Sequence, residues 1–172
     1  MVVLLLLLLF MANTTFCSQS LQLKVKNYAI SSLSFDDTWY IGADIGGTLS
    51  RFGFFQLQEK KPLLAFSVQT PTKDINDFNE TFSKILTYAY DVHKIKPEHI
   101  CIAAPGVTTA DKDFPSVHGL FDITKKDLIE KHHFKNVIIV NDLSVVGYGI
   151  DLIDQNNIVQ LSGSASKPRA LK

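Results

Sequence analysis

The chain has 172 residues, of which 46% are hydrophobic and 20% are charged, a composition typical of a globular protein with a core. Lysine plus arginine and aspartate plus glutamate both number 17, so no basic excess favours a nucleic-acid partner. The two cysteines exclude a disulfide framework and a zinc site built from cysteines. This length accommodates one domain with a short extension.

The N-terminal residues differ in composition from the rest of the chain. Residues 1–12, MVVLLLLLLFMA, are an uninterrupted apolar run, and the polar residues 13–37 follow as a linker. The run is short for a membrane span and has the length of a signal-peptide core, but no lysine or arginine precedes it. We keep three readings open: an export signal, a membrane tether, and an extension upstream of the true start. Residues 1–37 are therefore set apart from the fold.

The first part of the folded region reads as three strands in succession. They are predicted at residues 39–44, 51–58 and 63–70, where aromatic and β-branched residues cluster. A glycine pair follows the first strand, and residues 59–62 have turn character. Consecutive strands joined by tight turns predict an antiparallel meander.

Beyond the meander the hydrophobic period changes to three and four residues. This spacing predicts a helix with one apolar face. The face consists of Phe78, Phe82, Ile85, Leu86, Ala89 and Val92. Asp74 or Asn76 is expected to cap the start of the helix, and Pro97 lies just past its end.

Strands and helices then alternate to the end of the pattern. Buried strands are predicted at residues 99–104 and 137–140, and a short helix that runs to Lys131 lies between them. A helix at residues 143–150 and a strand at residues 158–161 follow. The order βββαβαβ, with one more helix and strand, predicts an α/β domain whose mixed β-sheet is flanked by helices.

The turn after the first strand carries the residues Asp44, Gly46, Gly47 and Thr48. Glycine permits positive φ and, without a Cβ, lets backbone N–H groups approach an anion, while Thr48 adds a hydroxyl donor. Asp44 offers an oxygen ligand to a hydrated Mg²⁺. These parts suit a nucleotide phosphate, although the usual phosphate-loop and dinucleotide motifs are absent. An ordinary hairpin with glycines in its turn is the alternative.

Asn141 and Asp142 follow the predicted strand at residues 137–140. A sugar hydroxyl attacks readily when a carboxylate within hydrogen-bond reach accepts its proton, a contribution of about 10²–10⁴-fold in rate. A neighbouring carboxamide donates and accepts, so it orients a hydroxyl-rich ring. Open α/β sheets bind ligands at such strand ends. Capping the next helix is the other role open to Asp142.

Two segments carry a resemblance to a known family. Residues 41–55, IGADIGGTLSRFGFF, resemble the first phosphate motif of the hexokinase, Hsp70 and actin superfamily. With Arg51, the pattern D-x-G-G-T-x-x-R resembles the bacterial glucokinase family. Residues 137–150, VIIVNDLSVVGYGI, resemble the strand and helix that carry the family's Asn-Asp pair. The resemblance implies a ribonuclease-H-like, actin-like ATPase lobe that uses ATP and Mg²⁺.

The resemblance also implies roles for single residues. Asp142 would be the general base that takes the 6-hydroxyl proton of glucose or a similar hexose, with Asn141 contacting the sugar. The turn at Gly106 and His118 in the following segment would lie at the sugar. The phosphates and Mg²⁺ would be held at the turn.

The residues implied to hold the phosphates and Mg²⁺ are Asp44, Gly46, Gly47, Thr48 and Arg51. No metal is expected to be fixed by the protein alone, because Mg²⁺ would arrive with ATP near Asp44.

The chain departs from the family pattern at Leu49, Val117 and His118. Leu49 stands where the family has asparagine, and Val117 and His118 stand where it has a Thr-Asn pair. These changes leave open a second reading, in which the chain is a non-catalytic sugar-binding or regulatory protein on the same scaffold.

The resemblance also divides the chain. Residues 38–165 correspond to an N-terminal lobe, and residues 166–172 form a tail. The second lobe, which completes the site in the family, is expected to be missing, so we expect little kinase activity from these residues alone. ATP use implies a cytoplasmic protein, with membrane attachment or export through residues 1–12 as the alternative. A homodimer of the full-length form is left open.

Overall fold

The computed structural model describes residues 23–28, 38–59, 61–106 and 113–149, and their strands form two sheets. The larger sheet has six strands in the order β1-β4-β3-β2-β5-β8. These strands are β1 (Lys24–Asn27), β2 (Tyr40–Ile45), β3 (Leu49–Gln58), β4 (Lys61–Pro71), β5 (His99–Ala104) and β8 (Asn136–Asn141). The smaller sheet pairs β6 (Phe114–Val117) with β7 (Phe121–Ile123).

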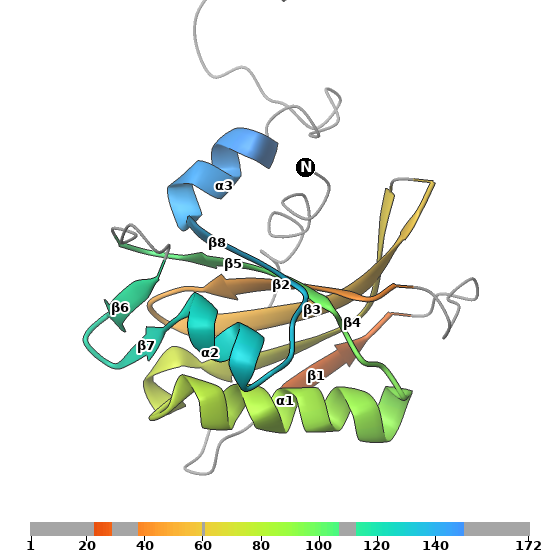
Figure 1. The fold of residues 1–172 in the computed structure, drawn as a ribbon, viewed down its shortest axis with the longest axis horizontal. Coiled ribbons are helices and arrows are strands. Elements are labelled where there is room, and N and C mark those ends of the chain that lie inside the picture. The colour runs from red at the N-terminus through yellow and green to blue at the C-terminus, as the bar shows by residue number, and fades with distance from the viewer. Residues whose placement is uncertain (1–22, 29–37, 60, 107–112, 150–172) are drawn as a thin grey trace, which may run out of the picture.

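Helices cover both faces of the larger sheet. They are α1 (Phe78–His93), α2 (Lys125–Glu130) and α3 (Asp142–Gly149), with a 3-10 helix η2 (Thr72–Asp74) after β4. Figure 1 shows α1 and α2 on one face of the sheet and α3 on the other. The α/β class and the mixed sheet predicted from the sequence are confirmed.

The sheet topology follows from the length of each connection. Short turns join β2, β3 and β4, which pair antiparallel as the predicted meander. β5 and β8 each follow a helix, and they pair parallel, β5 with β2 and β8 with β5. A crossover helix returns the chain to the same end of the sheet, so parallel strands result. β8 forms one edge of the described sheet and β1 the other.

The sequence analysis did not anticipate β1 or the β6–β7 ribbon. β1 lies within the segment set apart as leader and linker, and it pairs antiparallel with β4 from Lys24 opposite Gln69. The ribbon occupies residues 114–123, where no strand was predicted. The predicted strand at residues 158–161 lies outside the described residues.

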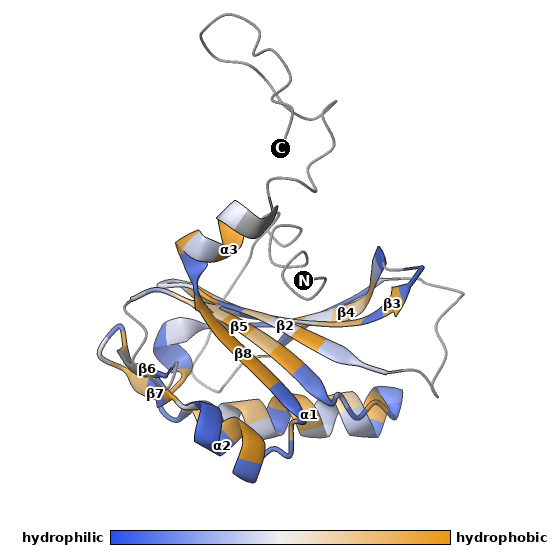
Figure 2. Ribbon diagram, turned by 45° about the horizontal axis from the view of Figure 1, so that its top comes forward, coloured by the Kyte–Doolittle hydropathy of each residue, from blue (hydrophilic) through white to orange (hydrophobic). Residues whose placement is uncertain are grey.

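The main core fills the space between the sheet and the helices α1 and α2 (Figure 2), and β5 shows the alternation that creates it. Ile100, Ile102 and Ala104 belong to this core. Cys101 and Ala103, which point to the other face, pack with Val145 of α3 instead. Both faces of β5 are therefore buried, which explains its continuous apolar sequence.

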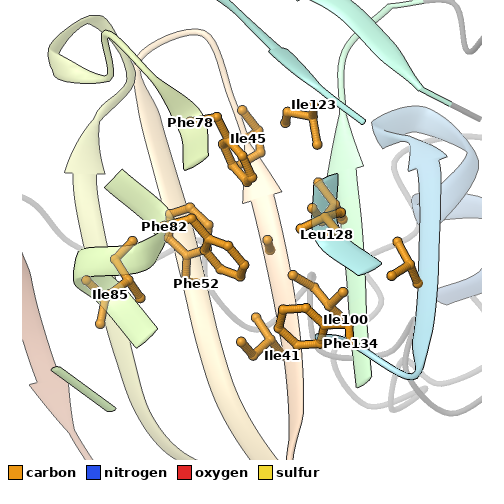
Figure 3. Packing of buried hydrophobic residues seen from close by; sticks show 14 of the residues in the cluster. Ile41, Ile45, Phe52, Phe78, Phe82, Ile85, Ile100, Ile123, Leu128 and Phe134 are labelled. Carbon is orange, nitrogen blue, oxygen red and sulfur yellow. The ribbon is translucent and has the colours of Figure 1, made fainter. Parts of the chain in front are cut away.

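Aromatic rings hold α1 on the sheet. The ring centroid of Phe52 in β3 lies 5.7 Å from that of Phe82 and 6.4 Å from that of Phe78, both in α1, and the ring centroid of Phe134 lies 5.9 Å from that of Phe82. Figure 3 shows these rings between the strands and the helix. Ring pairs at such distances stabilise by about 0.5–1.5 kcal/mol each beyond the burial of their area.

The ends of the helices have clear chemical causes. Asp77, and not Asp74 or Asn76 as predicted, caps α1, because its side chain accepts a hydrogen bond from the N–H of Glu80. Thr124 caps α2 in the same way through the N–H of Asp127. None of the helices in the described ranges combines the length and the apolar character needed to cross a bilayer. Residues 1–12 lie outside those ranges.

A matched pair of leucines tests the layer arrangement. Leu128 of α2 is 1% exposed, whereas Leu143 of α3 is 78% exposed. Leu128→Ala is expected to lower the free energy of unfolding by about 2–5 kcal/mol through lost burial and a cavity. Leu143→Ala is expected to change it by less than about 0.5 kcal/mol. Urea denaturation of both variants measures the difference, and equal losses would contradict the packing.

The buried Cys101 gives a second test of the same packing. Burial raises the pKa of the Cys101 thiol to about 12, so little thiolate is present at pH 8. Alkylation of Cys101 by iodoacetamide in the native protein is expected to be at least about 1000-fold slower than for an ordinary thiol. Mass spectrometry of the peptide measures the rate, and guanidinium provides the unfolded control. Equal rates with and without guanidinium would contradict the packing.

Candidate active site at the carboxyl ends of parallel strands

Three parallel strands end at one edge of the sheet and bring distant residues together. β5 pairs with β2 on one side, with Asp44 opposite Ala103, and with β8 on the other, with Asn141 opposite Ala104. Because parallel strands point the same way, Asp44 near the end of β2, Gly106 just after β5 and Asp142 just after β8 lie at neighbouring strand ends. The glycine turn after β2 and the Asn-Asp pair at the end of β8 thus lie at the same ends of the strands, with β5 between them (Figure 1).

Asp44 and Arg51 face each other across β2 and β3. Nη1 of Arg51 lies 3.0 Å from Oδ2 of Asp44, and their side chains are 21% and 25% exposed, respectively. Burial raises the pKa of the Asp44 carboxyl above its usual value, Arg51 opposes this rise, and the negative charge of Asp142 adds to it. Among these causes the charge of Asp142 contributes least, and it acts in the same direction as burial.

The glycine turn is closed by backbone bonds. The N–H of Gly46 donates to the carbonyl oxygen of Leu49 at 3.0 Å. A Cβ at Gly46 would lie 3.1 Å from that same oxygen, which explains why glycine is needed there. Gly46 and Gly47 do not adopt the positive φ that we expected, since positive φ among the described glycines occurs at Gly106 and Gly119. The glycines serve close approach instead.

His118 lies at the tip of the β6–β7 ribbon in a left-handed conformation with φ of 50°. Its exposed side chain approaches the glycine turn, because a Cβ at Gly47 would lie 3.5 Å from Cε1 and 3.6 Å from Nε2 of His118. The ribbon, which is the predicted sugar-facing segment, therefore lies next to the predicted phosphate turn. The role of His118 at the sugar stays a prediction.

Asn141 connects the ends of β5 and β8. Its Nδ2 donates to the carbonyl oxygen of Gly106 at 2.8 Å, and its Oδ1 accepts from the N–H of Leu143 at 3.0 Å. The same N–H also donates to Oδ1 of Asp142 at 2.8 Å. Asp142 thus serves the start of α3 with one oxygen, and within the described residues its Oδ2 accepts no hydrogen bond.

The sequence analysis missed Thr72 and Ser50. The hydroxyl of Thr72 donates to the carbonyl oxygen of Gly46 at 2.6 Å, and its N–H donates to that of Thr48 at 3.0 Å. Oγ of Ser50 lies 3.0 Å from Oγ1 of Thr72. Thr72 lies in η2, far along the chain from the turn, so no local sequence pattern connects the two.

The site offers little to a metal ion by itself. In the ranges that the structure describes, no group of three or more His, Cys, Asp or Glu side chains is placed to hold a metal ion. Asp44 gives one carboxylate oxygen to Arg51, which leaves its other oxygen for a hydrated cation. A single oxygen ligand fits Mg²⁺ that keeps most of its water and arrives with a phosphate.

The two glycines of the turn give a test of its geometry. Gly46→Ala is expected to lower the free energy of unfolding by about 1–3 kcal/mol, because the backbone at Leu49 must yield. Gly47→Ala meets only ordinary contacts with His118 and is expected to cost less than about 0.5 kcal/mol. Thermal and urea unfolding compare the variants. A Gly47→Ala loss as large as that of Gly46→Ala would contradict the turn described here.

The chain resembles known proteins in sequence and in fold. The model of the glucokinase family matches residues 41–172. Among solved structures, a glucokinase from an Antarctic psychrotroph is 20% identical with a TM-score of 0.62, over 76% of this chain and 40% of that one. A glucokinase from Balamuthia mandrillaris, solved in complex with glucose, is 21% identical with a TM-score of 0.54, over 66% of this chain and 32% of that one. No curated protein sequence matches the chain.

The chain spans less than half the length of both solved glucokinases. At these identities the likeness shows the fold, an α/β lobe of the actin-like ATPase type. The family model covers most of the chain, including the glycine turn and the Asn-Asp pair. The chain therefore belongs to the glucokinase family.

Proposed function

We propose that the protein containing this chain is an ATP-dependent hexose kinase that phosphorylates the 6-hydroxyl of glucose. The observation that supports it is the placement of Asp44 and Asp142 at strand ends on one sheet edge, with the charge of Asp142 acting on Asp44. Phosphate and sugar must meet at such a point. Membership of the family adds a hexose as the substrate class.

Asp142 is the general base in this proposal. One of its oxygens accepts from the N–H of Leu143, and the other is left to accept the proton of the sugar hydroxyl. As the proton moves to Asp142, the hydroxyl oxygen attacks the γ-phosphorus, the bond to the bridging oxygen breaks, and ADP leaves. The hydrogen bond from Leu143 keeps the carboxylate in place during the transfer.

Asn141 orients the sugar. Its amide uses one of two N–H groups on Gly106 and one of two oxygen lone pairs on Leu143. One donor and one acceptor are then left for sugar hydroxyls. Because Asn141 is fixed at both ends of its amide, it presents them in a defined direction.

The glycine turn and Asp44 form the phosphate side of the proposed site. The N–H of Gly47 and the hydroxyl of Thr48 suit phosphate oxygens, and Arg51 opposes the rise in the pKa of Asp44 that burial causes. Mg²⁺ bound near Asp44 would supply charge neutralisation to the phosphates. The adenosine contacts are proposed to come from outside this chain, which spans less than half of the solved glucokinases.

The departures at Val117 and His118 favour a second candidate function. The same scaffold would bind a hexose without transferring phosphate to it. His118 approaches the glycine turn in place of a smaller polar side chain, which changes the shape at the meeting point of sugar and phosphate. Both candidate functions include sugar binding, but only the kinase turns ATP over to ADP.

Asp142→Asn in the natural protein that contains these residues tests the proposal. Asparagine caps a helix as well as aspartate, so the change removes the base and keeps the fold. The kcat for glucose phosphorylation is expected to fall by about 10²–10⁴-fold while glucose binding changes little. A coupled ADP-release assay and calorimetric titration with glucose measure the two quantities.

Asp91→Asn, at an exposed position of α1, is the matched control and is expected to leave kcat unchanged. An Asp142→Asn variant that retains kcat would exclude Asp142 as the base. Glucose binding by the wild-type protein without any ADP release would instead favour the sugar-binding alternative.

A further inference from the structure

Thr72 is fully buried and begins η2, directly after β4. Its N–H donates to the carbonyl oxygen of Thr48, and its hydroxyl donates to that of Gly46. These two acceptors lie on either side of Gly47 in the chain. A single residue from another part of the sequence therefore holds the glycine turn on both sides.

The number of protons on the hydroxyls fixes the direction of the bonds. A carbonyl oxygen only accepts, so Thr72 uses its one hydroxyl proton on Gly46. Ser50, whose Oγ lies 3.0 Å from Oγ1 of Thr72, must then be the donor to Thr72. The result is a chain of hydrogen bonds from Ser50 through Thr72 to Gly46, in which each bond polarises the next.

Because the peptide bond is planar, these hydrogen bonds also set the direction of the next N–H, that of Gly47. Gly46 C=O and Gly47 N–H belong to one planar trans unit and point to opposite sides. Because the carbonyl is held toward Thr72, the N–H of Gly47 is directed away from η2. Within the part of the chain that the structure describes, this N–H makes no backbone hydrogen bond. It is a donor available to an anion.

We propose that Thr72 is a positioning residue. By holding the glycine turn, Thr72 directs the N–H of Gly47 toward the nucleotide phosphate. The proposal rests on the proposed function, since it takes the anion to be a phosphate of ATP. Thr72 acts through Gly46 and Thr48 and does not itself touch the nucleotide. Its removal would leave the turn carbonyls free to rotate toward the phosphate, where they repel it.

Three substitutions separate positioning from general stability. Thr72→Val keeps the shape of the side chain and removes the hydroxyl, and Thr72→Ser restores the hydroxyl. Thr70→Val is the matched control, because Thr70 is also buried, lies two residues earlier on β4, and has a hydroxyl without a hydrogen-bond partner in the described residues.

The measurements are calorimetric titration of the natural protein that contains these residues with Mg·ATP, and NMR of its Gly47 amide without ligand. Thr72→Val is expected to weaken Mg·ATP binding about tenfold, the effect of one hydrogen bond. It should also shift the Gly47 amide resonance and speed its exchange with solvent. Thr72→Ser and Thr70→Val are expected to stay within about twofold of the wild-type affinity.

Wild-type Mg·ATP affinity in Thr72→Val would overturn the proposal. If the natural protein that contains these residues binds no Mg·ATP, the phosphate assignment of the proposed function fails separately, and the Gly47 amide then tests the role of Thr72. An unchanged resonance and exchange rate of the Gly47 amide in Thr72→Val would then overturn the positioning role of Thr72. If Thr72→Val does not fold, Ser50→Ala replaces it, because that change removes only the donor to Thr72. A Gly47 amide unaffected by Ser50→Ala would overturn it as well.

Discussion

The parallel pairing of β5 with β2 and β8 is the constraint on which the rest of the site depends. Asp44 lies opposite Ala103, and Asn141 lies opposite Ala104, so one strand sets the positions of both chemical groups. Since β5 is buried on both faces, it has little freedom to move. The site residues that follow the three strands are held by hydrogen bonds of the sheet before any side chain contributes.

Burial at this edge also sets the electrostatics. Asp44 is desolvated, which raises its pKa, and Arg51 at 3.0 Å offsets only part of the rise. Asp142 adds a like charge that favours protonation of Asp44. One oxygen of Asp44 is left for a hydrated cation, which suits a phosphate that arrives with Mg²⁺.

The sequence predicted the elements whose signals are local. The meander, α1 and the parallel strands follow from short turns and from hydrophobic period, and the two site motifs lie at strand ends as expected. β1 was missed because its pairing partner is β4, some forty residues away. The ribbon at residues 114–123 was missed because it is short. Thr72 was missed because its hydrogen bonds join residues separated by 26 positions. Such pairings are decided by tertiary structure and leave no periodic trace.

The alternation along β8 has a consequence for the accuracy of the site. Val137 and Ile139 face the core, while Ile138 between them is 43% exposed. A slip of one residue against β5 would turn the two core residues to solvent and displace Asp142 by about 3.3 Å. A molecule in which Asp142 is displaced therefore also has a disrupted core, and it would unfold before it bound a substrate.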